Sequence, residues 1–344
     1  MEKMRAMVLS ECAKIETNPL KLTQIDRHEI KRGNEILLKI EACGVCHSQL
    51  HGIEGDWLDI GIPPALPTVP GHEVVGKIIG IGKDVTKFKV GDRAGITPLL
   101  EACQKCQYCL EGKEYLCESS IITGESFKGG YTEYITVTEN FATKVPESMK
   151  AEYAAPLFCA GITAYKAVKA AEPKQDKKIG IFGIGGVGHM AVQFAKVENC
   201  DVIAFSRTQS HLDVAKRLGA NDAMKFTENQ DEFLSTLKEK HGTLDAAIVF
   251  APADIVTDTA IKSVKKGGLI VIATVGENPA FSAFEEKTIR GTLIGSTKDM
   301  EQVIKICDEK NIEVITQTFP LENANEVLKK LKDSEIEARG VLIP

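Results

Sequence analysis

Short apolar runs alternate with amphipathic stretches through the middle of the chain. The runs occupy residues 179–182, 202–205, 246–250 and 269–273. Each is followed by a longer segment in which apolar residues recur at helical spacing. Strands that are apolar on both faces occur in parallel sheets covered by helices, so this part of the chain predicts successive βαβ units.

One helix among these units shows both of its ends in the sequence. Ser210 can accept hydrogen bonds from first-turn amides, and Gly219 stands where a C-terminal cap is wanted. Between them, Leu212, Ala215 and Leu218 fall on one face. The pattern predicts a helix that begins at Ser210 and connects two strands of the sheet.

The first 150 residues follow a different rhythm. Strands are predicted at 35–40 and 74–80, with glycines and prolines between them, which is typical of an irregular, barrel-like β domain. Strand and helix patterns resume after about residue 292 and end in a strand-like run at 339–343, without indicating which domain they join. The predicted fold class is α/β, with a doubly wound parallel sheet and a second, β-rich domain.

Length, charge and cysteine content narrow the functional classes. A chain of 344 residues fits two domains. The net charge of −6, with acidic and basic residues interspersed, leaves no basic field for nucleic acid. No hydrophobic leader and no apolar run of about eighteen residues occur, so we expect a cytoplasmic protein that does not bind membranes. The ten cysteines are then expected to be reduced, as metal ligands or packed thiols.

A glycine-rich motif follows the strand predicted at 179–182. Glycines spaced as Gly-x-Gly-x-x-Gly between a strand and a helix permit a tight turn and close approach of a pyrophosphate to the backbone. The helix N-terminus adds partial positive charge. The motif predicts a dinucleotide site that consists of Gly183, Gly185, Gly186, Val187 and Gly188.

The residues after the second strand, Ser206 and Arg207, bear on the choice of dinucleotide. An acidic residue at this place accepts the ribose hydroxyls of NAD. A serine hydroxyl and a guanidinium can instead donate to a 2′-phosphate, which a carboxylate would repel. We therefore expect NADP to be preferred, while NAD remains possible. The alternative is that Arg207 is a solvated loop residue beside a site indifferent to the phosphate.

Four cysteines lie close together in a polar segment. The spacing Cys103-x2-Cys106-x2-Cys109-x7-Cys117 lets four thiolates wrap one tetrahedral ion. Four protein sulfurs leave no open coordination position, so the pattern predicts a structural zinc. An iron–sulfur cluster is a minor alternative, because its familiar spacings differ.

A second group of metal-binding residue types is dispersed along the chain. Cys43-x-x-Cys46-His47 also matches haem-attachment and redox patterns, but haem attachment belongs to exported proteins and the redox motif belongs at a βα junction. His72 and Cys159, taken singly, are as well explained as a core histidine and an inert buried thiol. Only these residues taken together indicate a second metal site.

The order of these motifs resembles that of zinc-containing medium-chain alcohol dehydrogenases, over nearly the whole chain. The motifs are Gly44-Val45-Cys46-His47-Ser48-x-x-His51, Gly71-His72-Glu73, the four-cysteine loop, the segment around Cys159 and the glycines at 183–188. The resemblance implies a GroES-like catalytic domain at 1–153 and 292–344, and a Rossmann dinucleotide-binding domain at 154–291.

The resemblance also implies ligand roles. Cys46, His72 and Cys159 resemble the three permanent ligands of a catalytic zinc, and Glu73 a residue that approaches the metal as bound groups exchange. Two zinc ions per chain are therefore expected. Gln49 departs from the family, which usually carries aspartate there, and an amide raises the basicity of the ligand imidazole less than a carboxylate does. The remaining cysteines match no ligand position and are expected to be packed or surface thiols: Cys12, Cys43, Cys200 and Cys307.

Further roles follow from the same resemblance. Ser48 and His51 resemble a relay that carries the alcohol proton to solvent. His47 and Arg339 match positions that contact cofactor phosphates, although either residue could be a solvated surface cation. Trp57 resembles a wall of the substrate pocket, where the alternative is a core aromatic residue.

The function implied is hydride transfer between a primary or secondary alcohol, or the matching aldehyde or ketone, and NAD(P). Zinc-dependent polyol or threonine dehydrogenases and an NADP-dependent aldehyde reductase share these motifs, because substrate choice lies in the pocket. A non-catalytic zinc-binding module would explain the cysteine loop alone. A small-molecule partner and a homodimer or homotetramer are expected.

Overall fold

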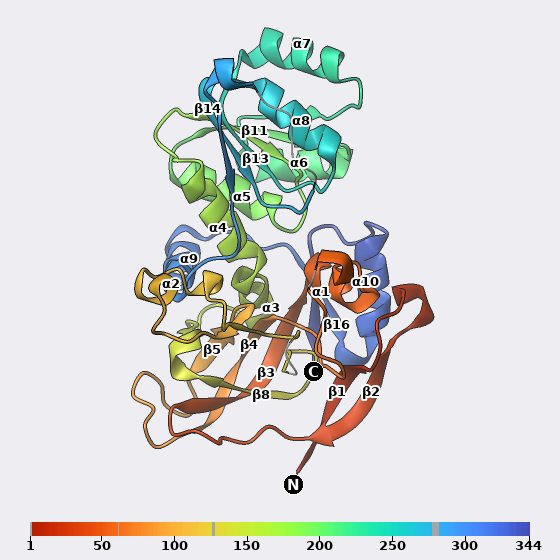
Figure 1. Ribbon diagram of the computed structural model, residues 1–344, viewed down its shortest axis with the longest axis vertical. Helices are drawn as coiled ribbons and strands as arrows, with labels where there is room; N and C mark the ends of the chain where they lie inside the picture. The colour runs from red at the N-terminus through yellow and green to blue at the C-terminus, as the bar shows by residue number, and fades with distance from the viewer. Residues whose placement is uncertain (1, 61, 126–127, 277–281) are drawn as a thin grey trace. The chain divides into compact units, whose positions relative to one another are not determined.

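The computed structural model describes residues 2–60, 62–125, 128–276 and 282–344 (Figure 1). The chain divides into two units. The first unit contains Met1–Cys159, Gly295–Glu309 and Val314–Pro344, and the second contains Ala160–Ile294 and Lys310–Glu313. The first unit thus extends past residue 153, where the sequence suggested a boundary, and includes Cys159.

The first unit is built on a seven-stranded sheet. The strand order is β16-β17-β3-β4-β5-β9, and β8 also pairs with β3. These strands are β3 (Glu35–Val45), β4 (Glu73–Ile81), β5 (Arg93–Ile96), β8 (Tyr134–Thr138), β9 (Ala142–Lys144), β16 (Thr316–Pro320) and β17 (Arg339–Ile343). Two smaller sheets pair β1 (Lys3–Leu9) with β2 (Leu20–Asp26), and β6 (Leu99–Glu101) with β7 (Ile121–Ile122).

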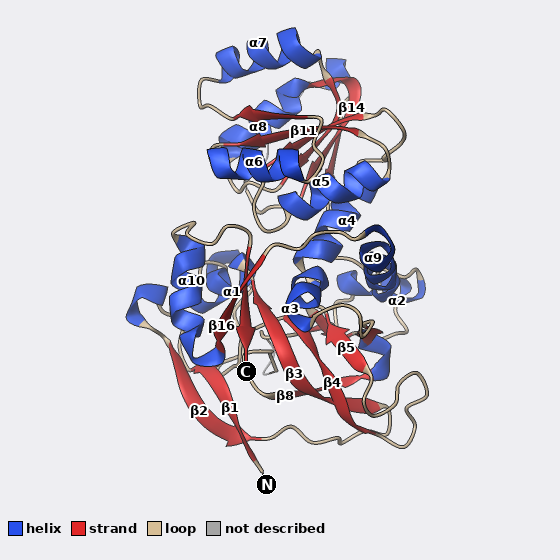
Figure 2. Cartoon of the chain, turned by 180° about the vertical axis from the view of Figure 1, so that it is seen from behind, coloured by secondary structure: helices blue, strands red, loops and turns tan. Residues whose placement is uncertain are grey.

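Five α-helices accompany these sheets in the described residues (Figure 2). They are α1 (His47–Glu54), α2 (Gln107–Leu110), α3 (Ala151–Ala154), α9 (Thr297–Lys310) and α10 (Ala324–Lys332), with a 3-10 turn η5 at Ala155–Phe158. The strands predicted at 35–40 and 74–80 are present, and β3 runs on to Val45 because its side chains remain almost entirely buried there. This extension delivers the chain to Cys46 at the start of α1.

The second unit is a parallel sheet of six strands in the order β12-β11-β10-β13-β14-β15. The strands are β10 (Lys178–Phe182), β11 (Asp201–Ser206), β12 (Asp222–Lys225), β13 (Leu244–Val249), β14 (Val264–Ile272) and β15 (Thr288–Gly291). The helices are α4 (Ala160–Ala170), α5 (Gly188–Val197), α6 (Gln209–Arg217), α7 (Gln230–His241) and α8 (Asp254–Ser263). All four apolar runs identified in the sequence form strands of this sheet.

Alternation along the strands explains why both faces of this sheet are covered. Phe182, Phe205 and Val249 point to one face, where they form a core with Phe233 of α7 and Ile261 of α8. The residues that precede them, Ile181, Ala204 and Ile248, are also fully buried and point to the opposite face. A doubly wound sheet requires this two-sided burial, so the predicted fold class is confirmed.

One helix boundary differs from the prediction. Helix α6 begins at Gln209 after Thr208, rather than at Ser210, and no side-chain oxygen caps its first turn. Ser210 lies inside the helix and is exposed. The C-terminal signal holds, because Gly219 has a φ of 100°, in the left-handed region that glycine adopts at little cost.

Residues 310–313 rejoin the second unit although the chain on either side of them belongs to the first. The Gln193 side chain of α5 exchanges two hydrogen bonds with the Glu313 backbone, accepting from its N–H at 2.8 Å and donating to its carbonyl at 2.9 Å. Arg217 also donates to the Glu313 carboxylate at 2.5 Å. Hydrogen bonds from Glu313 to α5 and α6 therefore attach residues 310–313 to the second unit.

Among the described residues, no helix is both long enough and apolar enough to cross a bilayer.

Candidate active site and metal centres

Four side chains that can ligate metals converge in the first unit. Cys46 precedes α1, His72 and Glu73 stand at the start of β4, and Cys159 follows η5. One ligand atom from each lies within 4.8 Å of the others. The sequence-predicted catalytic set, which spans more than a hundred positions, is thus brought together.

The sulfur atoms of this group are spaced as a tetrahedral metal requires. Cys46 Sγ and Cys159 Sγ are 3.9 Å apart. Two zinc–sulfur bonds of about 2.3 Å at a tetrahedral angle separate their sulfurs by roughly 3.8 Å. In addition, Glu73 Oε2 is buried without a hydrogen-bond partner among the described residues. The group therefore fits zinc both in its spacing and in the chemistry of its donors.

Glu73 reaches this group because its strand partner has no side chain. In the β3–β4 pairing, Gly44 lies opposite Glu73. A Cβ atom on Gly44 would stand 1.8 Å from Glu73 Oε2. Any other residue at this position of β3 would displace the carboxylate, so the site requires glycine there.

Burial and charge alter the ionisation of these groups. The neighbouring Cys159 thiol and the His72 ring lower the pKa of Cys46 well below its usual range, against the effect of burial. Burial raises the pKa of Glu73 to about 7, although Arg339 opposes the shift. A thiolate at Cys46 is the form that binds a metal.

Arg339 lies inside this cluster. It is 3% exposed, and its Nη2 donates to Glu73 Oε1. Strand β17 pairs with β3, and β3 pairs with β4, so these two residues meet although they are far apart in the sequence. The solvated-cation alternative for Arg339 is inconsistent with this burial.

The candidate relay residues lie on α1. Ser48 Oγ donates to Cys46 Sγ at 3.2 Å and is 3.4 Å from His72 Nε2. His51 stands one turn further along, with its Nδ1 2.9 Å from Asp56 Oδ2 and its ring stacked on Trp57 at a centroid distance of 5.4 Å. Ser48 therefore contacts the metal-ligand group directly, and His51 is partly exposed.

His47 and Trp57 occupy different environments beside the relay. His47 is exposed at the start of α1. Trp57 is half-buried and packs on His51 rather than in the interior of the β domain. The core-aromatic alternative for Trp57 is thereby weakened.

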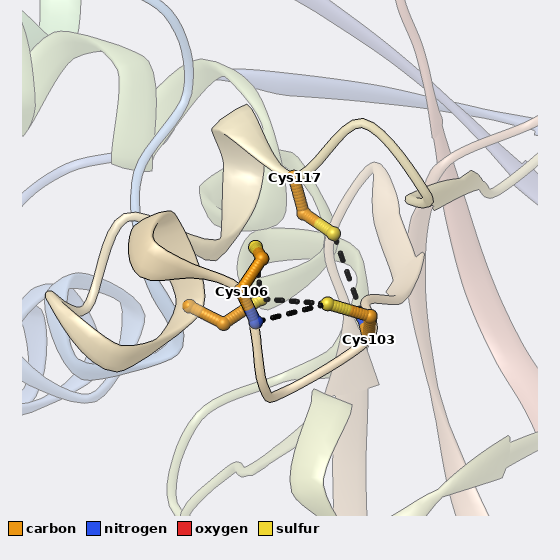
Figure 3. A group of neighbouring side chains, drawn as sticks. Cys103, Cys106 and Cys117 are labelled. Atoms are coloured by element: carbon orange, nitrogen blue, oxygen red, sulfur yellow. Dashed lines mark hydrogen bonds between the residues drawn. The ribbon is translucent and has the colours of Figure 1, made fainter.

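The four-cysteine loop folds its sulfurs together (Figure 3). The Sγ atoms of Cys103 and Cys109 are 3.9 Å apart, and those of Cys106 and Cys109 are 3.6 Å apart. These spacings fit a tetrahedral tetrathiolate ion. The backbone N–H groups of Lys105 and Cys106 lower the pKa of Cys103 to about 6, which favours the thiolate.

The glycine motif in the second unit lies where the strand order of the parallel sheet reverses, beside β10. Ligands bind at such switch points. Gly183 has a φ of 98° and donates to the Phe205 carbonyl at 2.9 Å. A Cβ atom on Gly188 would meet the Gly183 carbonyl at 1.9 Å, whereas one on Gly185 would meet nothing within 4 Å. Gly188 thus serves close packing, and Gly185 leaves open space above the turn.

The N-terminus of α5 is available to a ligand. No side chain caps it, and Val187 stands at its N-cap position. Together, the open space at Gly185 and the partial positive charge of the helix N-terminus suit a pyrophosphate. The residues of the predicted dinucleotide motif are therefore arranged as that function requires.

Ser206 is the last residue of β11, and Arg207 follows it. Ser206 is largely buried, and its Oγ accepts from Thr208 N–H at 3.3 Å. Arg207 is exposed. His211 of α6, which the sequence analysis did not identify, brings its Nδ1 to 3.4 Å from Ser206 Oγ. His211 is the third residue of α6, which follows Thr208. A correct prediction of the helix start would have indicated that His211 lies close to Ser206.

Two other residues were also missed. Asp56 pairs with His51, and the His51 hydrogen bond lowers the pKa of this carboxyl. Glu125 is partly buried, burial raises its pKa, and the nearby His72 opposes that shift. Neither residue belongs to a recognisable motif, because each acts through its position in space.

Most of the chain matches two described protein families. Residues 32–147 match the alcohol dehydrogenase GroES-like domain, and residues 186–309 match the zinc-binding dehydrogenase family. An alcohol dehydrogenase of Geobacillus stearothermophilus is 38% identical over 344 residues, covering 98% of this chain and 99% of that protein. The similarity therefore extends across both units.

Solved structures share the complete fold. Acetophenone reductase from Geotrichum candidum, in complex with NAD, is 28% identical with a TM-score of 0.88, covering 100% of this chain and 98% of that one. CAD from Helicobacter pylori, complexed with NADP(H), is 25% identical with a TM-score of 0.87, covering 99% of this chain and 98% of that one. These two similar proteins carry different nicotinamide cofactors.

Proposed function

Since the chain belongs to the zinc-dependent alcohol dehydrogenases, which transfer a hydride between an alcohol and a nicotinamide cofactor, we propose that its catalytic centre is the Cys46, His72 and Cys159 group. The observation that carries this assignment is the 3.9 Å spacing of Cys46 and Cys159 Sγ beside the buried Glu73. The four-cysteine loop is proposed to hold a second, structural zinc, giving two ions per chain.

Each residue of the catalytic group has a separate task in this proposal. When bound, zinc supplies a Lewis acid with one open coordination position. Cys46, His72 and Cys159 hold the ion, while Glu73 keeps a free carboxylate oxygen beside it. Arg339 donates to the other oxygen of the Glu73 carboxylate and so positions this residue of the metal group. Separately, Arg339 and His47 are proposed to contact the cofactor phosphates.

The proton of the alcohol is proposed to leave through α1. Ser48 Oγ, at the metal group, would accept that proton, and His51, further along α1, would release it. A bound cofactor would supply the ribose hydroxyls between these two side chains. Asp56 orients the His51 ring, and Trp57 stacks on it and is proposed to wall the substrate pocket. His51 is partly exposed, so it can release the proton to solvent.

His51→Gln is expected to slow alcohol oxidation about tenfold to a hundredfold near pH 7 and below, with a smaller effect at alkaline pH. The reason is that solvent accepts the proton readily only when hydroxide is abundant. Initial rates across a pH series test the relay, with His241→Gln in the second unit as the matched control. A pH–rate profile that matches the parent would remove His51 from the mechanism.

NADP is proposed as the preferred cofactor. Ser206 and Arg207 occupy the place at the end of β11 where NAD-binding proteins carry a carboxylate that accepts the ribose hydroxyls. His211 places its ring Nδ1 beside Ser206 Oγ. A guanidinium paired with a phosphate forms a charge-assisted contact worth about 1.5–3 kcal/mol when shielded. Because Arg207 is exposed, screening by salt reduces this contribution.

The parent enzyme is therefore expected to favour NADP over NAD by about tenfold to a hundredfold in kcat/KM, with a preference that shrinks as salt rises. Ser206→Asp combined with Arg207→Gln should reverse the preference, because the new carboxylate repels the 2′-phosphate and accepts from the ribose. Side-by-side kinetics with both cofactors provide the test. Arg217→Gln, which removes an exposed positive charge at the far end of α6, is the control. A parent that favours NAD tenfold would refute the assignment.

The setting of the enzyme is proposed from its thiols. All ten cysteines lie within the described residues, and none of them forms a disulfide. Free thiols in this number suit a reducing compartment, so a cytoplasmic location is proposed. A homodimer or homotetramer is proposed as its assembly, which light scattering would measure, and a panel of alcohols and aldehydes would identify the substrate.

A further inference from the structure

At the candidate catalytic site, the Gln49 side chain lies between a backbone nitrogen and a histidine ring nitrogen. It is 2% exposed. Its Oε1 accepts from Gly71 N–H at 2.5 Å, and its Nε2 is 2.9 Å from His72 Nδ1. A backbone N–H can only donate, so the contact with Gly71 fixes which end of the amide carries oxygen. The NH2 group must then face His72.

This orientation sets the direction of a longer hydrogen-bond chain. The Gln49 amide donates to His72 Nδ1, which therefore carries the lone pair, and the proton of the neutral ring stays on Nε2. His72 Nε2 is 3.4 Å from Ser48 Oγ, and Ser48 Oγ donates to Cys46 Sγ at 3.2 Å. Every link from the Gly71 N–H to the Cys46 sulfur runs in the same direction.

A metal at Nε2 requires the opposite arrangement. A neutral histidine that binds a metal through Nε2 carries its proton on Nδ1, which must then donate outward. The Gln49 NH2 group cannot accept that proton. Rotating the amide would bring its oxygen to His72 but would set the NH2 group against the Gly71 N–H, so one buried donor loses its acceptor either way.

The side chain has little room to avoid this conflict. A Cβ atom on Gly124 would lie 2.8 Å from Gln49 Oε1 and 2.7 Å from Gly71 N. The amide is therefore held closely between these backbone segments. A carboxylate of the same shape would have two acceptor oxygens and could satisfy both donors at once.

We propose that Gln49 is a positioning residue that keeps the His72 proton on the metal-facing nitrogen in the metal-free enzyme, so that zinc binds the catalytic group more weakly than its ligands allow. This inference rests on the proposed catalytic metal group. It identifies Gln49 as the residue that makes this zinc the more exchangeable of the two, because binding must break a continuous hydrogen-bond chain.

The test combines metal affinity with the state of the His72 ring. Full-length parent, Gln49→Glu and the exposed control Gln24→Glu are equilibrated in zinc-buffered solutions, and bound zinc is measured for each. Gln49→Glu replaces one NH2 group by oxygen at constant shape and should tighten the weaker site about tenfold to a hundredfold. Gln24→Glu adds the same charge on β2 and should leave the affinity unchanged.

The second readout follows the proton of the His72 ring in the parent and in Gln49→Glu. In 15N-histidine-labelled parent protein, His72 should carry its proton on Nε2 without zinc and on Nδ1 with zinc. In metal-free Gln49→Glu the proton should already be on Nδ1. An Nδ1 proton in the metal-free parent, or equal zinc affinity in Gln49→Glu and Gln24→Glu, would overturn the inference. A parent that binds only one zinc per chain even at saturating zinc would instead overturn the proposed catalytic group.

Discussion

Cys46→Ala is expected to lower the zinc content from two ions per chain to one, and to lower kcat/KM for alcohol oxidation at least about a thousandfold. Cys46 lies at the centre of the group, because its sulfur interacts with Ser48, His72 and Cys159. Without its thiolate, His72 and Cys159 alone provide too few permanent ligands. The Lewis acid, worth several kcal/mol at the transition state, is then lost.

Cys43→Ala is the matched control for this experiment. Cys43 lies three residues earlier on β3 and is fully buried, so its truncation costs more packing than that of Cys46. It should nevertheless keep both zinc ions and most of the activity. If Cys46→Ala retains two zinc ions, or if Cys43→Ala loses one, the ligand assignment is wrong.

Cys106→Ser is expected to lower Tm by at least about 5 °C while changing the turnover of the folded enzyme much less. Between Cys103 and Cys117 the described elements are the four-residue helix α2 and a three-residue 3-10 turn, so a bound ion contributes a large share of the folding free energy of this loop. Serine cannot replace the thiolate. Zinc content should again fall to one ion, this time with the catalytic ion kept.

Thermal unfolding and active-site-normalised kinetics measure the two effects separately. Cys12→Ser is the control, because Cys12 is a half-buried thiol of the first unit that lies outside both groups and contacts the Gly52 carbonyl. A Cys106→Ser protein that melts like the parent yet has no activity would contradict the division between a structural and a catalytic metal.

Local sequence patterns predicted the parallel sheet well and one helix start poorly. Strands β10, β11, β13 and β14 are visible in the sequence because each contains a run of buried apolar residues that faces both sides of the sheet. The start of α6 was misplaced because Thr208 and Ser210 are both acceptable N-cap residues, and neither provides a side-chain cap in the structure.

The metal groups were predictable as sets of residues, whereas their surroundings were not. The short spacing of the four-cysteine loop is itself a ligand pattern, so the sequence was sufficient there. The Glu73–Arg339 pair depends on β17 joining β3 in the sheet, which no local pattern encodes. The orientation of Gln49 likewise depends on the Gly71 N–H, a backbone donor that the sequence cannot place in space.

The return of residues 310–313 to the second unit limits how this chain can be recombined with related enzymes. An exchange of residues 160–294 alone would transplant Gln193 and Arg217 but leave behind Glu313, to which both are bonded. The incoming α5 would then face an unrelated backbone segment. A chimera that changes the cofactor unit should therefore carry two inserts, 160–294 and 310–313, even though the second is only a short stretch within the C-terminal part of the chain.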